Sequence, residues 1–134
     1  MRRSLVGNER FMSLHKLTLC ELQKQFQAGE VTATEIVRAY FLRIGHVEPK
    51  VKAFVTQAKE SAFMEAEVLD RKLKGWRKTQ PLTGMPLAIK DNICTDGVST
   101  TCSSRMLQNF VPPYDSTVIA KLRAQEYILL GKTN

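Results

Sequence analysis

The chain has 134 residues, 43% of them hydrophobic, and a formal net charge of +7, which suits one modest globular domain and excludes a disordered segment. It contains no apolar run near the roughly 18 residues of a membrane span, so we expect no membrane partner. Its three cysteines, Cys20, Cys94 and Cys102, lack the spacing of metal ligands, and an odd number of them fits a reducing compartment. We therefore predict a cytoplasmic protein with no metal or cofactor of its own.

The first thirteen residues are polar and carry three arginines without an apolar core. This composition is not that of a signal peptide. We predict that residues 1–13 form an N-terminal tail outside the folded domain.

Two capping boxes mark the starts of two helices. Thr18 is followed by Glu21, and Thr32 by Glu35, and in this arrangement each threonine caps a helix whose third residue returns a carboxylate to the cap. Apolar residues then recur at helical spacing after both boxes. We expect the second helix to end at Pro49, because proline disfavours helical geometry in the residue before it.

Residues 53–56 are a strand candidate, and a third helix is predicted over 57–73. Four acidic residues of this helix alternate with basic ones, which indicates a solvated face and not a pair of carboxylates for acid–base chemistry. The four are Glu60, Glu65, Glu67 and Asp70. The helical part thus covers about 14–75, a polar connector follows at 76–83, and the sheet begins in 84–134.

The segment Gly84–Asn92 holds the most distinctive pattern in the chain. The apolar run that ends at Ile89 is typical of a buried strand, and Lys90 follows it directly. Ligands bind at the carboxyl ends of strands in open α/β sheets, and a lysine held there partly out of water can act as a neutral base. For an isolated lysine, pairing with Asp91 at a strand end is the simpler interpretation.

Small hydroxyl residues are concentrated in segment 95–105, after the Lys90 strand. They could form an oxyanion pocket or a simple turn. We expect this segment to line the site, with neither Ser103 nor Ser104 as nucleophile, since no glycine-flanked elbow surrounds them. We also expect Cys94 and Cys102 to be structural.

A second buried strand is predicted over 127–130, after a helix capped by Asp115 or Ser116. Strand, helix and strand together form a βαβ crossover. Lys132 follows this strand much as Lys90 follows the first, and we expect it to be a surface residue.

From residue 81 the chain reads PLTGMPLAIKDNICTDGVSTTCSS, and it closes with GKTN. This pattern closely resembles the amidase signature family, over about residues 14–134. The run NFVPPYDSTV at 109–118 is similar to the branch formed by the A subunits of the glutamyl-tRNA(Gln)/aspartyl-tRNA(Asn) amidotransferase. The resemblance implies an α/β fold class: the N-terminal part of the amidase signature fold, with helices followed by a βαβ unit of a mixed sheet, so that 14–134 is an incomplete domain.

The family uses a Ser–cis-Ser–Lys triad, and Lys90 matches its lysine. The resemblance therefore implies that Lys90 is catalytic. In the family both serines lie beyond the GKTN segment, so this chain lacks them and is expected to be inactive alone. The family also has Ala-Gly where this chain has Gln125-Glu126, and glutamate in a left-handed helix cap costs roughly 1 kcal/mol.

For the complete protein of this branch, the resemblance implies hydrolysis of glutamine to ammonia. A partner B subunit then uses the ammonia with ATP and Mg to amidate the aminoacyl-tRNA, and a small C subunit completes the complex. Three alternatives stay open: another amide hydrolase of the family acting alone, a non-catalytic remnant that serves as a binding or scaffold piece, and a small basic RNA-binding protein. The last lacks stacking aromatics or a known RNA module.

Overall fold

The computed structural model describes residues 13–74 and 79–134. Within them, no helix is long and apolar enough to cross a membrane. The predicted tail thus lies outside the described residues except for Ser13, as do residues 76–78 of the predicted connector. The elements in chain order are η1 (Leu14–Lys16), α2 (Leu19–Ala28), α3 (Ala33–Val51), β1 (Phe54–Gln57), α4 (Lys59–Lys72), β2 (Pro86–Lys90), η2 (Arg105–Leu107), α5 (Thr117–Arg123) and β3 (Ile128–Thr133).

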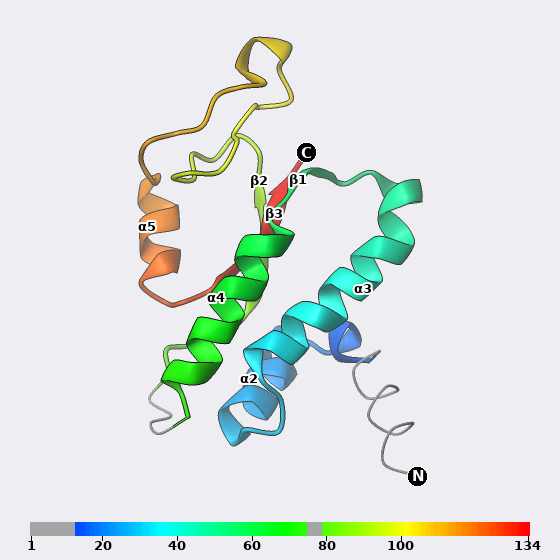
Figure 1. Ribbon diagram of the computed structural model, residues 1–134, viewed down its shortest axis with the longest axis vertical. Helices are drawn as coiled ribbons and strands as arrows, with labels where there is room; N and C mark the ends of the chain where they lie inside the picture. The colour runs from blue at the N-terminus through cyan, green and yellow to red at the C-terminus, as the bar shows by residue number, and fades with distance from the viewer. Residues whose placement is uncertain (1–12, 75–78) are drawn as a thin grey trace.

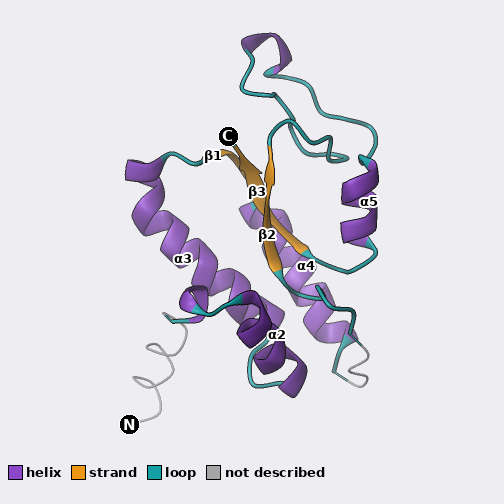
Figure 2. Cartoon of the chain, turned by 180° about the vertical axis from the view of Figure 1, so that it is seen from behind, coloured by secondary structure: helices purple, strands orange, loops and turns teal. Residues whose placement is uncertain are grey.

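A three-stranded mixed sheet lies at the centre of the fold (Figures 1 and 2). The strand order is β1-β3-β2, with β1 antiparallel and β2 parallel to β3. The parallel pair is joined through α5, which confirms the predicted βαβ unit and the α/β fold class. In both views α3 and α5 lie on opposite sides of the sheet, and α4 crosses one of its faces.

Two apolar cores form on the two faces of the sheet. Ile128 and Leu130 of β3 join the core built by α2, α3 and α4. Leu129, between them in sequence, joins the smaller core that includes Ile119 of α5. This alternation follows from the two-residue period of a strand.

Both predicted capping boxes are present. The hydroxyl oxygen of Thr18 accepts from the backbone N–H of Glu21 at 3.3 Å, and that of Thr32 from Glu35 at 3.1 Å. Each glutamate carboxylate accepts the N–H of its threonine at 2.8 Å. The starts of α2 and α3 are therefore fixed by local sequence, as predicted.

The prediction that Pro49 ends α3 was wrong, because the helix continues to Val51. Proline in the last turn removes a single N–H from the helix, which continues for only two residues beyond it. The helix ends instead at Lys52, which takes a left-handed conformation and donates its N–H to the carbonyl of Glu48 at 2.9 Å.

Asp70 belongs to a structural contact and not to a solvated face, which corrects the prediction for this residue. Its carboxylate accepts the N–H groups of Ala33 and Thr34 at 2.7 and 2.9 Å, and the Thr34 hydroxyl at 2.6 Å. These are the first residues of α3, whose free N–H groups and helix dipole favour an anion. Asp70 thereby ties α4 to the start of α3.

β3 runs further than predicted, through Gly131 and Lys132 to Thr133. At Gly131 the backbone φ is +152°, and a Cβ there would lie 2.3 Å from the carbonyl oxygen of Thr56 on β1. Only glycine permits this close approach of the two strands. Glycine here is thus part of the sheet and not its end.

The turn that follows α5 contains a left-handed residue, Glu126, at φ +58°. This is the strained position that the family resemblance indicated. Ser116 occupies the N-cap of α5 but its hydroxyl makes no capping bond. Asp115, the other predicted cap, instead accepts from the N–H of Asp96 at 2.8 Å and from the guanidinium of Arg123 at 2.5 Å.

Candidate active site

Lys90 is the last residue of β2 and pairs in register with Thr133 of β3. Leu87 and Ile89 are more buried than Ala88 and Lys90, which confirms the predicted alternation. The Lys90 side chain is exposed in this chain, and not partly out of water as we expected. It borders a cavity of about 250 Å³ that is lined by Lys90, Asp91, Asn92, Cys102, Ser103, Thr133 and Asn134.

Asp91 turns away from solvent and organises the loop that follows β2. Its side chain is 1% exposed. Its Oδ2 atom accepts the N–H of Thr101 at 3.1 Å, the Thr101 hydroxyl at 2.5 Å and the N–H of Ser103 at 3.4 Å. The loop therefore leaves the sheet after Lys90, and Asp91 bonds the returning part of the loop at Thr101, ten residues further along the chain.

The returning part of the loop brings polar groups to the cavity. Cys102 and Ser103 take left-handed conformations, at φ 51° and 55°, and the N–H of Cys102 donates to the carbonyl of Asp91 at 3.1 Å. The Ser103 hydroxyl donates to Oδ1 of Asn134 at 2.8 Å. Of segment 95–105, Cys102 and Ser103 line the cavity beside Lys90, whereas Ser104 does not reach it.

All three cysteines are free thiols, and Cys102 is exposed and borders the cavity. Cys94 is half-buried, and its thiol donates to the hydroxyl oxygen of Tyr114 at 3.6 Å.

Lys132 is fully buried, which overturns the prediction that it lies on the surface. Its ammonium donates to the carbonyl of Ile93 at 2.6 Å and to the hydroxyls of Thr95 and Thr100 at 3.2 and 2.8 Å. Burial lowers the pKa of Lys132, and the nearby charge of Asp91 opposes that shift.

A register shift determines the face of the sheet on which Lys132 lies. Between Leu87 and Ala88 of β2, the partner on β3 advances from Leu129 to Gly131. One extra residue in a strand moves the residues after it to the opposite face. Lys132 consequently pairs with Ile89, and the two lie on the face covered by α5 and the loop after β2.

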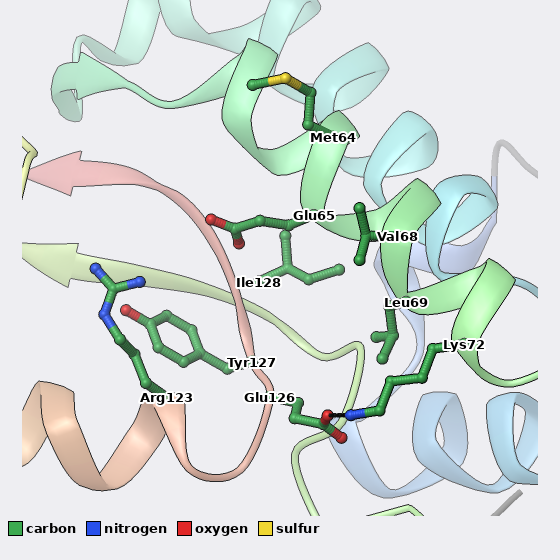
Figure 3. A pocket seen from close by; sticks show the side chains of 9 residues that line it. All are labelled: Met64, Glu65, Val68, Leu69, Lys72, Arg123, Glu126, Tyr127 and Ile128. Carbon is green, nitrogen blue, oxygen red and sulfur yellow. Dashed lines mark hydrogen bonds and ion pairs between the residues drawn. The ribbon is translucent and has the colours of Figure 1, made fainter.

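A second, larger groove lies between α4 and the start of β3 (Figure 3). Its volume is about 500 Å³, and Lys72 and Glu126 form an ion pair at one end. Burial raises the pKa of Glu65 at its other end, and the charge of Arg123 opposes this. The groove shares no residue with the Lys90 cavity, so we do not assign the candidate chemistry to it.

The residues around the cavity carry one amine, two carboxamides and two hydroxyls, with a thiol at its border. An amine that has lost its proton can act as a base toward a hydroxyl nucleophile. The described residues place a single serine hydroxyl, that of Ser103, at the cavity. The described residues therefore bring one lysine and one serine to this cavity, and no second serine.

Comparison with known proteins places this arrangement in a family. Residues 35–134 match the family model described as "Amidase". The chain is 48% identical, over 123 residues, to the A subunit of the glutamyl-tRNA(Gln) amidotransferase of Desulforudis audaxviator, and 44% identical to that of Alkaliphilus metalliredigens. In both cases the match covers 92% of this chain and 25% of the relative.

Solved structures agree with the sequence matches. The peptide amidase of Stenotrophomonas maltophilia superposes with a TM-score of 0.84 at 32% identity, over 92% of this chain and 26% of that one. The chain spans about a quarter of the length of the curated relatives that it matches. It belongs to the amidase signature family, and it corresponds to an N-terminal part of the family's domain.

Proposed function

We propose that the chain is the N-terminal part of the glutamine-hydrolysing A subunit of an aminoacyl-tRNA amidotransferase. The observation that carries this proposal is the 48% identity, over 92% of the chain, to a relative named as the A subunit of a glutamyl-tRNA(Gln) amidotransferase. The peptide amidase matches at 32%. The sequence similarity thus favours the tRNA branch over amide hydrolases that act alone.

Lys90 is the proposed base. In its neutral form the amine accepts a proton from a bridging serine, which accepts one from the nucleophilic serine. The oxygen of that serine then attacks the carboxamide carbon of glutamine, ammonia leaves with a proton, and water releases glutamate. In the family that the chain resembles, both serines follow the GKTN segment with which these 134 residues close.

The position of Lys90 supports this role. It stands at the carboxyl end of a strand that is parallel to its neighbour, the edge at which open α/β sheets bind ligands. Its exposure in this chain leaves the amine accessible to groups from the remainder of the fold. By itself the chain is proposed to be inactive, because removing members of a serine triad costs several orders of magnitude in rate.

The proposed partners follow from the same branch. A B subunit would use the ammonia, with ATP and Mg, to convert Glu-tRNA(Gln) or Asp-tRNA(Asn) to the amidated forms, and a C subunit would complete the complex. The A subunit meets tRNA only through the complex, and the whole is proposed to work in the cytoplasm.

A chimaera tests the proposal. The 123 aligned residues of this chain replace their counterpart in the D. audaxviator protein, and the product is purified with the B and C subunits of that organism. We expect glutamine hydrolysis and formation of Gln-tRNA(Gln). An assembled chimaera that hydrolyses other carboxamides but not glutamine would favour an amide hydrolase that acts alone. An assembled chimaera without any hydrolysis would support a non-catalytic binding role.

A further inference from the structure

Lys132 is a buried charge that the proposed mechanism does not use. It lies in the central strand β3 and has 0% of its surface exposed. A lysine is almost never buried completely unless its charge is compensated. Its position one register step before the Thr133–Lys90 pair places it directly behind the candidate site.

All three hydrogen-bond partners of the Lys132 side chain belong to one segment, residues 93–100. They are the carbonyl of Ile93 and the hydroxyls of Thr95 and Thr100. Both threonines are themselves buried, at 0% and 2% exposure. The amino group thus holds this segment against β3 at three points.

In this hydrogen-bond arrangement, the charged form of Lys132 satisfies every acceptor around its side chain. The Thr95 hydroxyl donates its proton to the Ile93 carbonyl at 3.1 Å, and that of Thr100 donates to the Val98 carbonyl at 3.1 Å. Neither hydroxyl has a second proton to give, so each can only accept from Lys132. Three acceptors need three N–H donors, which an ammonium has and a neutral amine lacks.

Asp91 completes the attachment of the loop at the other end. Its buried carboxylate holds Thr101 and Ser103, and its charge is of the sign that stabilises the ammonium of Lys132. Lys132 therefore holds segment 93–100, and the oppositely charged Asp91 holds the residues that come directly after it. The residues that follow it, Thr101 to Ser103, are the ones that return to the Lys90 cavity.

We propose that Lys132 is a positioning residue for the Lys90 site: its ammonium fixes segment 93–100 on β3 and thereby sets where Cys102 and Ser103 lie beside Lys90. That Lys132 matters for function rests on the proposed role of Lys90. The placement itself is a property of this chain and can be measured without catalysis.

The test uses the full 134-residue chain, labelled for NMR, with the variant Lys132→Met, which keeps an unbranched side chain and removes the donors. We expect the side-chain signals of Lys90 and the amide signals of residues 101–103 to shift. Hydrogen exchange in 93–103 should accelerate at least about tenfold relative to β1 and α3, since local opening then no longer breaks these bonds.

Three further variants separate a local effect on the Lys90 site from a general loss of stability. Ile36→Val lowers stability within the helical core and should leave the Lys90 and 101–103 signals in place. Thr100→Val removes one acceptor without changing shape and should reproduce the shifts in part, whereas Thr100→Ser should restore the wild-type signals. If Lys132→Met fails to fold, the Thr100 pair decides.

Unchanged Lys90 and 101–103 signals in Lys132→Met, with a uniform loss of stability like that of Ile36→Val, would overturn the proposal and leave Lys132 a purely structural residue. If Lys132→Met is unfolded, unchanged signals in Thr100→Val would do the same. Glutamine hydrolysis is not measured here, so failure of the proposed function would not alter either result.

Discussion

Lys90 and Lys132 lie on adjacent parallel strands, one register step apart, in opposite surroundings. Lys132 pairs with Ile89, and Lys90 pairs with Thr133. Lys90 is exposed at a cavity, whereas Lys132 is buried and donates three hydrogen bonds to the loop that links the two. One lysine is thus open to solvent at the cavity, and the other is bonded within the loop that leads back to that cavity.

The carboxylate of Asp70 should stabilise the fold measurably. Asp70→Asn keeps the shape but removes the charge that faces the start of α3. We expect a loss of about 1 kcal/mol in the free energy of unfolding, the typical value for an N-terminal helix cap. Urea denaturation measures it. Glu67→Gln, on an exposed position of the same helix, is the control and should change little. Equal effects of the two variants would contradict the assignment.

Glu126 should be a site where glycine improves stability. It holds a left-handed conformation at φ +58°, which costs a residue with a side chain about 1 kcal/mol. Its ion pair with the exposed Lys72 and the hydrogen bond that its carboxylate accepts from Thr83 at 3.2 Å offset part of that cost. We therefore expect Glu126→Gly to raise the thermal midpoint and Glu126→Gln, which loses the pair and keeps the strain, to lower it. A lower midpoint for the glycine variant would show that the side-chain contacts outweigh the strain.

Asp115 should contribute stability that is lost in acid. Burial opposes ionisation, but the guanidinium of Arg123 and the N–H of Asp96 hold the pKa of Asp115 below its ordinary value of 3.8. The folded state thus binds this proton less readily than the unfolded state. The stabilisation is complete above pH 3.8 and disappears as the pH falls through the lower folded-state pKa.

Thermal midpoints recorded between pH 7 and pH 2.5 test this for the wild type and for Asp115→Asn. The variant should be less stable at neutral pH and should lose less stability on acidification. Parallel acid profiles for the two proteins would show that Asp115 does not contribute to the acid sensitivity.

The parts of the fold that local sequence determines could be predicted. Thr18 with Glu21 and Thr32 with Glu35 act within one helical turn, so the starts of α2 and α3 follow from the sequence. The contact of Asp70 with Thr34 could not be predicted, because its partners lie 36 positions apart and meet only after α3 and α4 pack.

The candidate site was predictable to a similar degree. Lys90 stood out because a charged residue follows a buried strand, and a family resemblance gave it a role. Lys132 follows an equally apolar strand, and its burial depends on one extra residue in β3 and on a loop that folds back over it. Neither feature leaves a periodic signal in the sequence, so Lys132 was expected on the surface as a residue that follows the end of a strand.

The proposed role of Lys90 is tested most directly by glutamine hydrolysis in the chimaera with the D. audaxviator protein. Lys90→Ala should lower kcat by a factor of about a thousand or more, as loss of a triad member does in serine hydrolases, without altering assembly or the circular dichroism spectrum. Lys121→Ala, at an exposed position of α5, should retain normal turnover. Near-normal turnover in the assembled Lys90→Ala chimaera would contradict the account and remove Lys90 from the chemistry.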